Sequence, residues 1–360
     1  MNAQFLRKSI SYDYGTRESL IFVNHLRYGD KSKMKEQLDV FKVMANTGVD
    51  TSSESQIKNN KNNFGSLGKD IFIKKETDDL TIIEKDNNIV ALGDCIKFME
   101  NMKTESVDLI FADEPYNIGK DFGNDSDKQE SREYIDWNKV WIDEAMRILK
   151  PNGTMYLMTS TQFMPYVDIY MQENFNVLCR IVWSYDSSGV QSKKMYGSLY
   201  EPILMVSKSE KSKITFNSSE IMVEAKTGAK RKLIDYRKNP PAPYNTKKVP
   251  GNVWNFPRVR FKMDEYENHP TQKPEALLER IIQASSNIGE VVFDPFGGSF
   301  STSAVASRLN RKSISIDMNP EYFEIGLRRV LGFSEYNGKE LIKEKKRKTK
   351  NKSKKDRGQK

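Results

Sequence analysis

Short apolar runs alternate with helical patterns through most of the chain from residue 88 onward. The run at 107–112 is the clearest, because five of its six residues are Val, Leu, Ile, Phe or Ala. Strands are predicted at 89–92, 107–112, 154–158, 180–184, 203–207, 291–293 and 313–316, and helices at 135–149, 274–282 and 302–309. The fourth and fifth strands are predicted to pair antiparallel. Short apolar strands alternating with helices predict an α/β fold, with an open, largely parallel sheet covered on both faces.

Residues 1–85 lack this alternation and are predicted to form an N-terminal extension and linker. Helical spacing occurs between Arg17 and Val49, whereas residues 51–63 are polar and low in complexity. Three interpretations are open for the extension: a dimerisation appendage, a DNA-contacting appendage or a poorly ordered segment. Residues 86–335 are predicted to form the folded domain.

Positive charge is concentrated in two segments. Residues 339–360 contain twelve Lys or Arg and three acids, so this segment alone carries a net charge of +9, the same as the whole chain. The tail from 336 to 360 is therefore predicted to be disordered, either binding polyanions or keeping the chain soluble. Residues 186–262 contain sixteen Lys or Arg and six acids, interleaved with Tyr196, Tyr236 and Trp254. Such a mixture suits nucleic-acid contact, with a solvated basic surface as the alternative.

Composition argues against several other classes. Two cysteines, Cys95 and Cys179, cannot make a disulfide scaffold, and two histidines argue against a metal site. No apolar stretch approaches the roughly 20 residues that span a bilayer. The N-terminus lacks the apolar segment of a secretory signal. The chain is expected to be cytoplasmic, with no membrane partner and no metal.

A turn after a late strand has the chemistry of a nucleotide site. The segment 294–299, Asp-Pro-Phe-Gly-Gly-Ser, follows one predicted strand and precedes a helix, and the next strand ends in Asp317. Small residues allow close backbone approach, and an acid about 20 residues further on is placed to accept ribose hydroxyls. A tight structural turn is the alternative. No triphosphate or pyrophosphate loop is present, so an adenosine-containing cofactor other than ATP or NAD is favoured.

The strand at 107–112 ends in Asp113, Glu114, Pro115 and Tyr116. A carboxylate, a rigid turn and an aromatic ring at the tip of a buried strand can hold one planar amine. A lone motif of this kind more often marks a strand-ending aspartate that caps a turn. The neighbouring cofactor chemistry makes the amine cradle the preferred interpretation.

Five ordered segments resemble the β-class DNA amino-methyltransferases. They are Gly93-Asp94-Cys95, SVDLIFADEPYNIGKDF, HPTQKPEALLERII, DPFGGSFSTSAVA and SISIDMNPEY, and the similarity runs from about residue 89 to residue 329. The resemblance implies a Rossmann-like sheet that uses S-adenosylmethionine, a circularly permuted motif order, and an inserted target-recognition region at about 186–262. The segments at 183–204 and 228–254 look closest to a bacterial subgroup associated with ATGCAT-type sites.

The resemblance also implies a cofactor pocket. Asp317 would bind the ribose, Asp94 would accept from the adenine amine, and Thr271 with Lys273 would lie near the methionine carboxylate. His269 would position a loop rather than act as a base. The remaining pocket residues would be Cys95, Asp294, Phe296, Gly298 and Ser299. Phe300 stands where many relatives have a glycine.

For the reaction, the resemblance implies methylation of the exocyclic N6 of adenine in double-stranded DNA by base flipping. Asp113 and the carbonyl of Glu114 would accept the amine hydrogens, Pro115 would fix the turn and Tyr116 would stack on the base. The family motif has proline where this chain has Glu114, so full activity, slowed activity and a non-catalytic DNA binder all stay open. Cytosine-N4 methylation is an alternative, as is an RNA or small-molecule substrate.

Recognition of DNA is assigned to six cations. They are Lys193, Lys194, Arg231, Arg237, Lys247 and Arg258. The enzyme would work near the nucleoid, as a homodimer or alone, and either free-standing or with a cognate restriction endonuclease.

Overall fold

The computed structural model describes residues 64–73, 79–117, 130–186, 193–226, 231–336 and 341–343. The helical pattern predicted before Val49, the linker at 51–63 and most of the basic tail lie outside the described residues. Within the described part, no helix is both long enough and apolar enough to cross a membrane.

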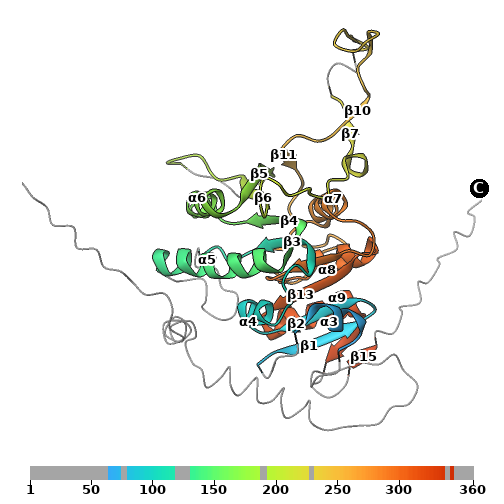
Figure 1. Cartoon of the computed structure of the whole chain (residues 1–360). Helices are drawn as coiled ribbons and strands as arrows, with labels where there is room; N and C mark the ends of the chain where they lie inside the picture. The colour runs from blue at the N-terminus through green and yellow to red at the C-terminus, as the bar shows by residue number, and fades with distance from the viewer. Residues whose placement is uncertain are drawn as a thin grey trace, which may run out of the picture.

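Within the described residues, nine strands form one central sheet (Figure 1). Their order across the sheet is β1 (Thr81–Lys85), β2 (Asn88–Leu92), β13 (Lys312–Asp317), β12 (Val291–Asp294), β3 (Val107–Asp113), β4 (Leu149–Met158), β6 (Tyr200–Ser207), β5 (Asn176–Ser184) and β11 (Val253–Asn255). Five neighbouring strands, β2, β13, β12, β3 and β4, are parallel, whereas β6 runs antiparallel to both of its neighbours. The predicted α/β fold and the antiparallel β5–β6 pair are confirmed.

Helices cover both faces of the sheet (Figure 1). One face carries α4 (Cys95–Glu100), α5 (Ser131–Ile148) and α6 (Met164–Asn174), and the other carries α7 (Glu275–Ser285), α8 (Ser301–Arg308) and α9 (Pro320–Leu331).

The sequence of strand β3 is almost continuously apolar because both of its faces are packed against helices. Ile110 and Ala112 belong to the cluster that contains Trp141 of α5, whereas Leu109 and Phe111 belong to the cluster with α7 and α8. Alternate side chains of a strand point to opposite faces, so a strand covered on both sides has no position for a solvated residue. This packing fixes the carboxyl end of β3, where Asp113 lies.

The insertion between β6 and α7 contains little regular structure. Its 3₁₀ helix (Ser218–Ile221) is followed by two-residue strands: β7 (Val223–Glu224), β8 (Ile234–Asp235), β9 (Ala242–Pro243) and β10 (Lys247–Lys248). We call the described residues 223–226 and 231–252 the basic arm. It extends beyond the β11 edge of the sheet (Figure 1).

The folded region begins earlier than the expected boundary at residue 85. Helix α3 (Ser66–Ile71) and β1 both precede that boundary, and β1 pairs with β2. The mostly buried Glu84 joins them, because its carboxylate accepts the backbone N–H groups of Leu67 at 3.0 Å and Gly68 at 3.1 Å. At the other end, β14 (Phe333–Tyr336) pairs with β15 (Leu341–Lys343), so a short strand lies within the segment predicted to be a disordered tail.

Candidate active site

One pocket opens where four strands of the sheet end. Residues at or just after the carboxyl ends of β2, β3, β12 and β13 line it, together with the loop that precedes α7. Ligand sites of open α/β sheets lie at this edge. All the predicted catalytic and cofactor residues line this pocket: Asp94, Cys95, Asp113, Glu114, Pro115, Tyr116, Thr271, Lys273, Asp294, Phe296, Gly298, Ser299 and Asp317.

Asp317, at the end of β13, organises the glycine turn beside it. Its carboxylate accepts the backbone N–H of Gly298 and that of Asn319, each at 2.8 Å. Gly298 has φ +51°, and a Cβ there would lie 2.9 Å from Nε2 of His269. The backbone conformation and the close approach therefore both favour glycine at this position. Burial raises the pKa of Asp317 to about 6, against the lowering effect of these N–H donors.

Asp294, at the end of β12, is held in a similar way. It is 3% exposed and accepts the N–H of Phe296 at 3.0 Å. Burial raises its pKa to about 7. The Phe296 ring packs edge-on against Trp141, with the ring centres 5.0 Å apart. This turn thus places one carboxylate and one flat apolar surface on the same pocket wall.

Asp94 and Cys95 supply the wall after β2. Asp94 caps α4 by accepting the N–H of Lys97 at 3.0 Å. Carboxylates from three strand ends and the Phe296 ring fit a group that carries a sugar diol, an exocyclic amine and a planar purine. The pocket therefore fits the adenosine part of the predicted cofactor. We call this region the cofactor half.

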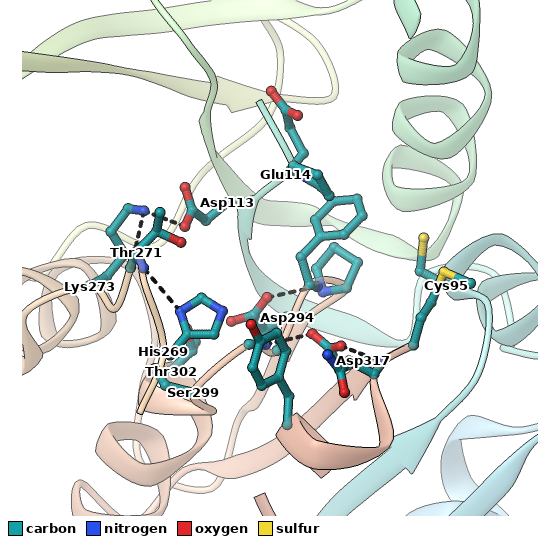
Figure 2. Close-up of a pocket in the computed structure, with 18 of the residues that line it drawn as sticks. Cys95, Asp113, Glu114, His269, Thr271, Lys273, Asp294, Ser299, Thr302 and Asp317 are labelled. Atoms are coloured by element: carbon teal, nitrogen blue, oxygen red, sulfur yellow. Dashed lines mark hydrogen bonds and ion pairs between the residues drawn. The ribbon is translucent and has the colours of Figure 1, made fainter. Parts of the chain in front are cut away.

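The opposite wall is built around Asp113. Its carboxylate accepts the hydroxyl of Tyr116 at 2.8 Å and also accepts the Lys273 ammonium (Figure 2). Burial raises the pKa of Asp113, while Lys273 acts in the opposite direction. The Lys273 ammonium also lies 5.4 Å from the centre of the Tyr116 ring. We call this region the base half.

Glu201, at the start of β6, is a fourth member of the base half that the sequence analysis missed. Its carboxylate lies 2.8 Å from the Tyr116 hydroxyl and 3.6 Å from the Lys273 ammonium. The tyrosine precedes Glu201 by 85 residues, so no local spacing connects them. An acid two residues before the apolar run at 203–206 was the one available signal.

Comparison with known proteins assigns the chain to a family. A sequence profile described as DNA methylase, N6_N4_Mtase, matches residues 107–328. DNA adenine methyltransferase YhdJ of Escherichia coli (strain K12) is 59% identical over 265 residues, which is 74% of this chain and 90% of YhdJ. The type II methyltransferase M.HpaI of Haemophilus parainfluenzae is 37% identical over 255 residues, 70% of this chain and 76% of M.HpaI.

The chain belongs to the N6/N4 DNA methylase family. The family predicted from the ordered motifs is thereby confirmed. The fold is also shared with the PvuII DNA methyltransferase (cytosine-N4-specific), with a TM-score of 0.53 over 68% of this chain and 86% of that chain, at 19% identity.

Within this methylase pocket, the Lys273 ammonium pairs with Asp113 (Figure 2). Its place near the methionine carboxylate of the cofactor stays a prediction. The carbonyl of Thr271 accepts from the same ammonium at 3.1 Å, and the N–H of Thr271 donates to Nδ1 of His269 at 3.3 Å. His269 thus holds the loop in place, as expected for a positioning residue.

Glu114, the departure from the family motif, is buried and lies on the far side of the turn from Asp113. Its side chain is 2% exposed, and its carboxylate accepts the hydroxyl of Tyr134 from α5. Burial and the adjacent carboxylate both raise the pKa of Tyr134 well above its ordinary value, so the hydroxyl keeps its proton. The Glu114 carboxylate points away from both Asp113 and the cofactor half (Figure 2).

Phe300 and Ser299, after the two glycines of this turn, lie in different surroundings. Phe300 has φ +54°, the left-handed conformation that glycine adopts most easily, and is fully buried beside Val90 and Phe323 rather than lining the pocket. Ser299 lines the pocket, and its hydroxyl lies 3.0 Å from that of Ser301.

The six predicted DNA-binding cations fall into two groups. Five are exposed: Lys193 and Lys194 before β6, and Arg231, Arg237 and Lys247 on the basic arm. Arg258 is half-buried, and its guanidinium lies 5.0 Å from the centre of the Tyr185 ring. Because Tyr185 donates to Glu201 at 3.4 Å, Arg258 connects the insertion to the base half. The DNA contacts of all six stay predictions.

Proposed function

We propose that this protein transfers a methyl group from S-adenosylmethionine to N6 of adenine in double-stranded DNA. The observation that carries the proposal is the pocket itself, in which a cofactor half and a base half face one another within one methylase fold. The name of the 59% identical relative, a DNA adenine methyltransferase, supports adenine as the target.

The cofactor half would bind S-adenosylmethionine. Asp317 would accept the ribose hydroxyls, Asp94 the adenine amine, and Phe296 would pack on the purine ring. When bound, the cofactor supplies a methyl group on a positively charged sulfur. The chain's contribution is to orient that methyl group toward Asp113 and to exclude water from the path between them.

The base half would hold the flipped adenine. An exocyclic amine is a poor nucleophile because its lone pair is delocalised into the ring. Asp113 and the Glu114 carbonyl would accept the two amine hydrogens and bring the lone pair toward the methyl group, while Tyr116 would stack on the ring. The nitrogen–carbon bond would form as the sulfur–carbon bond breaks, which leaves a neutral thioether and puts the positive charge on nitrogen. The surplus proton would then pass from the methylated amine to solvent.

We infer that Glu114 is compatible with turnover. The reaction uses its backbone carbonyl, which any residue supplies. Its side chain is directed into the protein, where Tyr134 donates to it. The Glu114 side chain therefore does not place its charge beside the cofactor.

We also propose that the basic arm and the segment before β6 bind an ATGCAT-type palindromic site. Support comes from the resemblance of residues 183–204 and 228–254 to that subgroup and from the exposed cations on this surface. A palindrome is read most simply by two copies of the chain, so a homodimer is part of the proposal. A cognate restriction endonuclease and a location at the nucleoid are consistent with the same role.

The test is to incubate the full chain with methyl-labelled S-adenosylmethionine and unmethylated bacterial duplex DNA, then to digest the DNA to nucleosides. Label in N6-methyl-2′-deoxyadenosine is expected, and competition by RNA or free adenine should be weak. Label in N4-methylcytosine would contradict the target assignment. Cofactor binding without transfer, with transfer restored in Glu114→Pro, would show that Glu114 blocks the reaction.

A further inference from the structure

Both oxygens of Asp113 already accept a donor in this arrangement. One oxygen accepts the Tyr116 hydroxyl at 2.8 Å, and the other accepts the Lys273 ammonium. A charge-assisted bond of the second kind is among the stronger hydrogen bonds in proteins. Each carboxylate oxygen can accept a second hydrogen, but Tyr116 and Lys273 then compete with the amine for the charge of Asp113. The amine is therefore held most strongly when these donors move away from Asp113.

Glu201 lies within reach of both donors. Its Oε2 atom is 2.8 Å from the Tyr116 hydroxyl and 3.6 Å from the Lys273 ammonium. A tyrosine hydroxyl has a single hydrogen, so Tyr116 can donate to Asp113 or to Glu201 but not fully to both. The Lys273 ammonium would need to move by less than about 1 Å to form a normal charge-assisted bond with Glu201.

Charge in the base half favours such an exchange over loss of Lys273 to solvent. Lys273 is 6% exposed and lies between two carboxylates. Burial alone would lower the pKa of Lys273, but Asp113 and Glu201 outweigh it and raise the pKa, so the group stays charged. A buried ammonium that leaves one carboxylate needs another beside it, because an unpaired buried charge is strongly unfavourable.

We propose that Glu201 is a positioning residue: its carboxylate accepts the hydrogen bonds of Lys273 and Tyr116 when the target amine reaches Asp113. Before the base enters, the two donors keep Asp113 covered. After entry they bond to Glu201, Asp113 is open to the amine, and the Tyr116 ring stays fixed by its hydroxyl in the stacking position. This inference rests on the proposed function, since the entering group is the amine of a flipped base.

Contact with DNA can bias the exchange. Tyr185 donates to the other oxygen of Glu201 at 3.4 Å, and the Arg258 guanidinium lies over the Tyr185 ring. Arg258 belongs to the predicted recognition region. A phosphate that draws Arg258 away from Tyr185 would therefore act on the residue that holds Glu201.

Glu201→Gln tests the proposal, because it keeps size and an oxygen acceptor but removes the charge that attracts Lys273. The matched control is Glu210→Gln, the same change at an exposed position beyond the end of β6. Single-turnover transfer from labelled S-adenosylmethionine to unmethylated bacterial duplex DNA should fall about 10- to 100-fold in Glu201→Gln. The KM values for DNA and cofactor should stay within about twofold, and the control should match wild type.

A double-variant cycle separates this role from a merely structural one. In a Lys273→Met background, Glu201→Gln should cause little further loss, because the charged donor is gone and the Gln oxygen can still accept the Tyr116 hydroxyl. If the two substitutions lowered the transfer rate independently, so that the double variant lost the product of the two single losses, the proposal would be overturned. So would a Glu201→Gln protein that melts normally and transfers at the wild-type rate. A wild type that transfers no methyl group to DNA would overturn the proposed function, and the inference with it.

Discussion

The two halves of the pocket hold their carboxylates in different ways. In the cofactor half, Asp294 and Asp317 accept backbone N–H groups of the turns that follow β12 and β13. In the base half, Asp113 accepts the ends of two side chains, Tyr116 and Lys273. Backbone donors are fixed by the fold, whereas side-chain donors can rotate. We therefore infer that the cofactor half is a preformed site, whereas the base half rearranges when its ligand arrives.

The largest effect is expected from Asp113→Asn, which breaks the base half and spares the cofactor half. The amide still accepts a hydrogen bond but loses the negative charge that draws on the target amine, so methyl transfer should fall on the order of 1,000-fold. Cofactor affinity, measured by calorimetry on the same preparation, should change by less than about threefold. A similar loss in both quantities would mean that the halves are not separable.

Asp317→Asn is the complementary change. It weakens both the ribose contact and the bonds that fix the Gly298 turn, so cofactor affinity should fall about 10- to 100-fold. Saturating cofactor should restore most of the transfer rate. A loss confined to the maximal rate would contradict the assignment of Asp317 to the cofactor half.

Lowering the pH should reduce the affinity of the cofactor half for the cofactor. Burial raises the pKa of Asp317 to about 6 and that of Asp294 to about 7, above the ordinary aspartate value of 3.8. Both groups are therefore protonated more easily in the folded protein, and their contribution to folding stability is lost as pH rises from about 4 to 7.

Cofactor affinity should change in the opposite direction. A bound cofactor that donates to the carboxylates favours their charged form, so its affinity should rise roughly tenfold from pH 5.5 to 7.5. Titration by calorimetry measures this, and Asp317→Asn should flatten the curve.

Tyr134→Phe tests whether the buried Glu114 depends on its donor. Loss of the hydroxyl should lower the free energy of unfolding by about 1 to 3 kcal/mol, because a buried carboxylate loses a partner. Tyr170→Phe removes an exposed hydroxyl–carboxylate pair with Asp143 and should cost no more than about 0.5 kcal/mol. Denaturant titration of both variants gives the comparison, and equal costs would argue against a stabilising Glu114–Tyr134 pair.

The smallest effect is expected on the basic arm, outside both halves. Lys247→Ala should weaken duplex-DNA binding only a few-fold and lower the slope of log affinity against log salt by about 0.9, the value of one phosphate contact. Lys139→Ala, on the outer side of α5, is the control and should leave the slope unchanged. An unchanged slope in Lys247→Ala would remove this residue from the DNA-binding set.

The cofactor half could be predicted from sequence because its parts are local. Asp294 ends one strand and is followed directly by the glycine turn, and Asp317 ends the next strand along the chain. Asp294, Gly298 and Asp317 are therefore visible as a strand–turn–helix–strand pattern. The strands themselves were found because burial on both faces leaves a short, continuous apolar run.

The base half was only partly predictable, because it joins residues that are far apart in sequence. Asp113 and Tyr116 were found from the tetrapeptide, but Glu201 arrives from β6 and is brought close by the pairing of β6 with β4. The pairing of Lys273 with Asp113 spans 160 residues and has no local sequence signature. The start of the fold at α3 was missed for the same reason, since Glu84 ties it to β1 by contacts that no periodic pattern shows.

Methylation-sensitive sequencing of DNA from cells that express the wild type or Asp113→Asn tests the central claim most directly. The wild type should produce N6-methyladenine at one short palindromic site, and Asp113→Asn should produce none at a similar protein level. Unmodified DNA from cells containing folded wild-type protein, or modification of cytosine in place of adenine, would contradict the account.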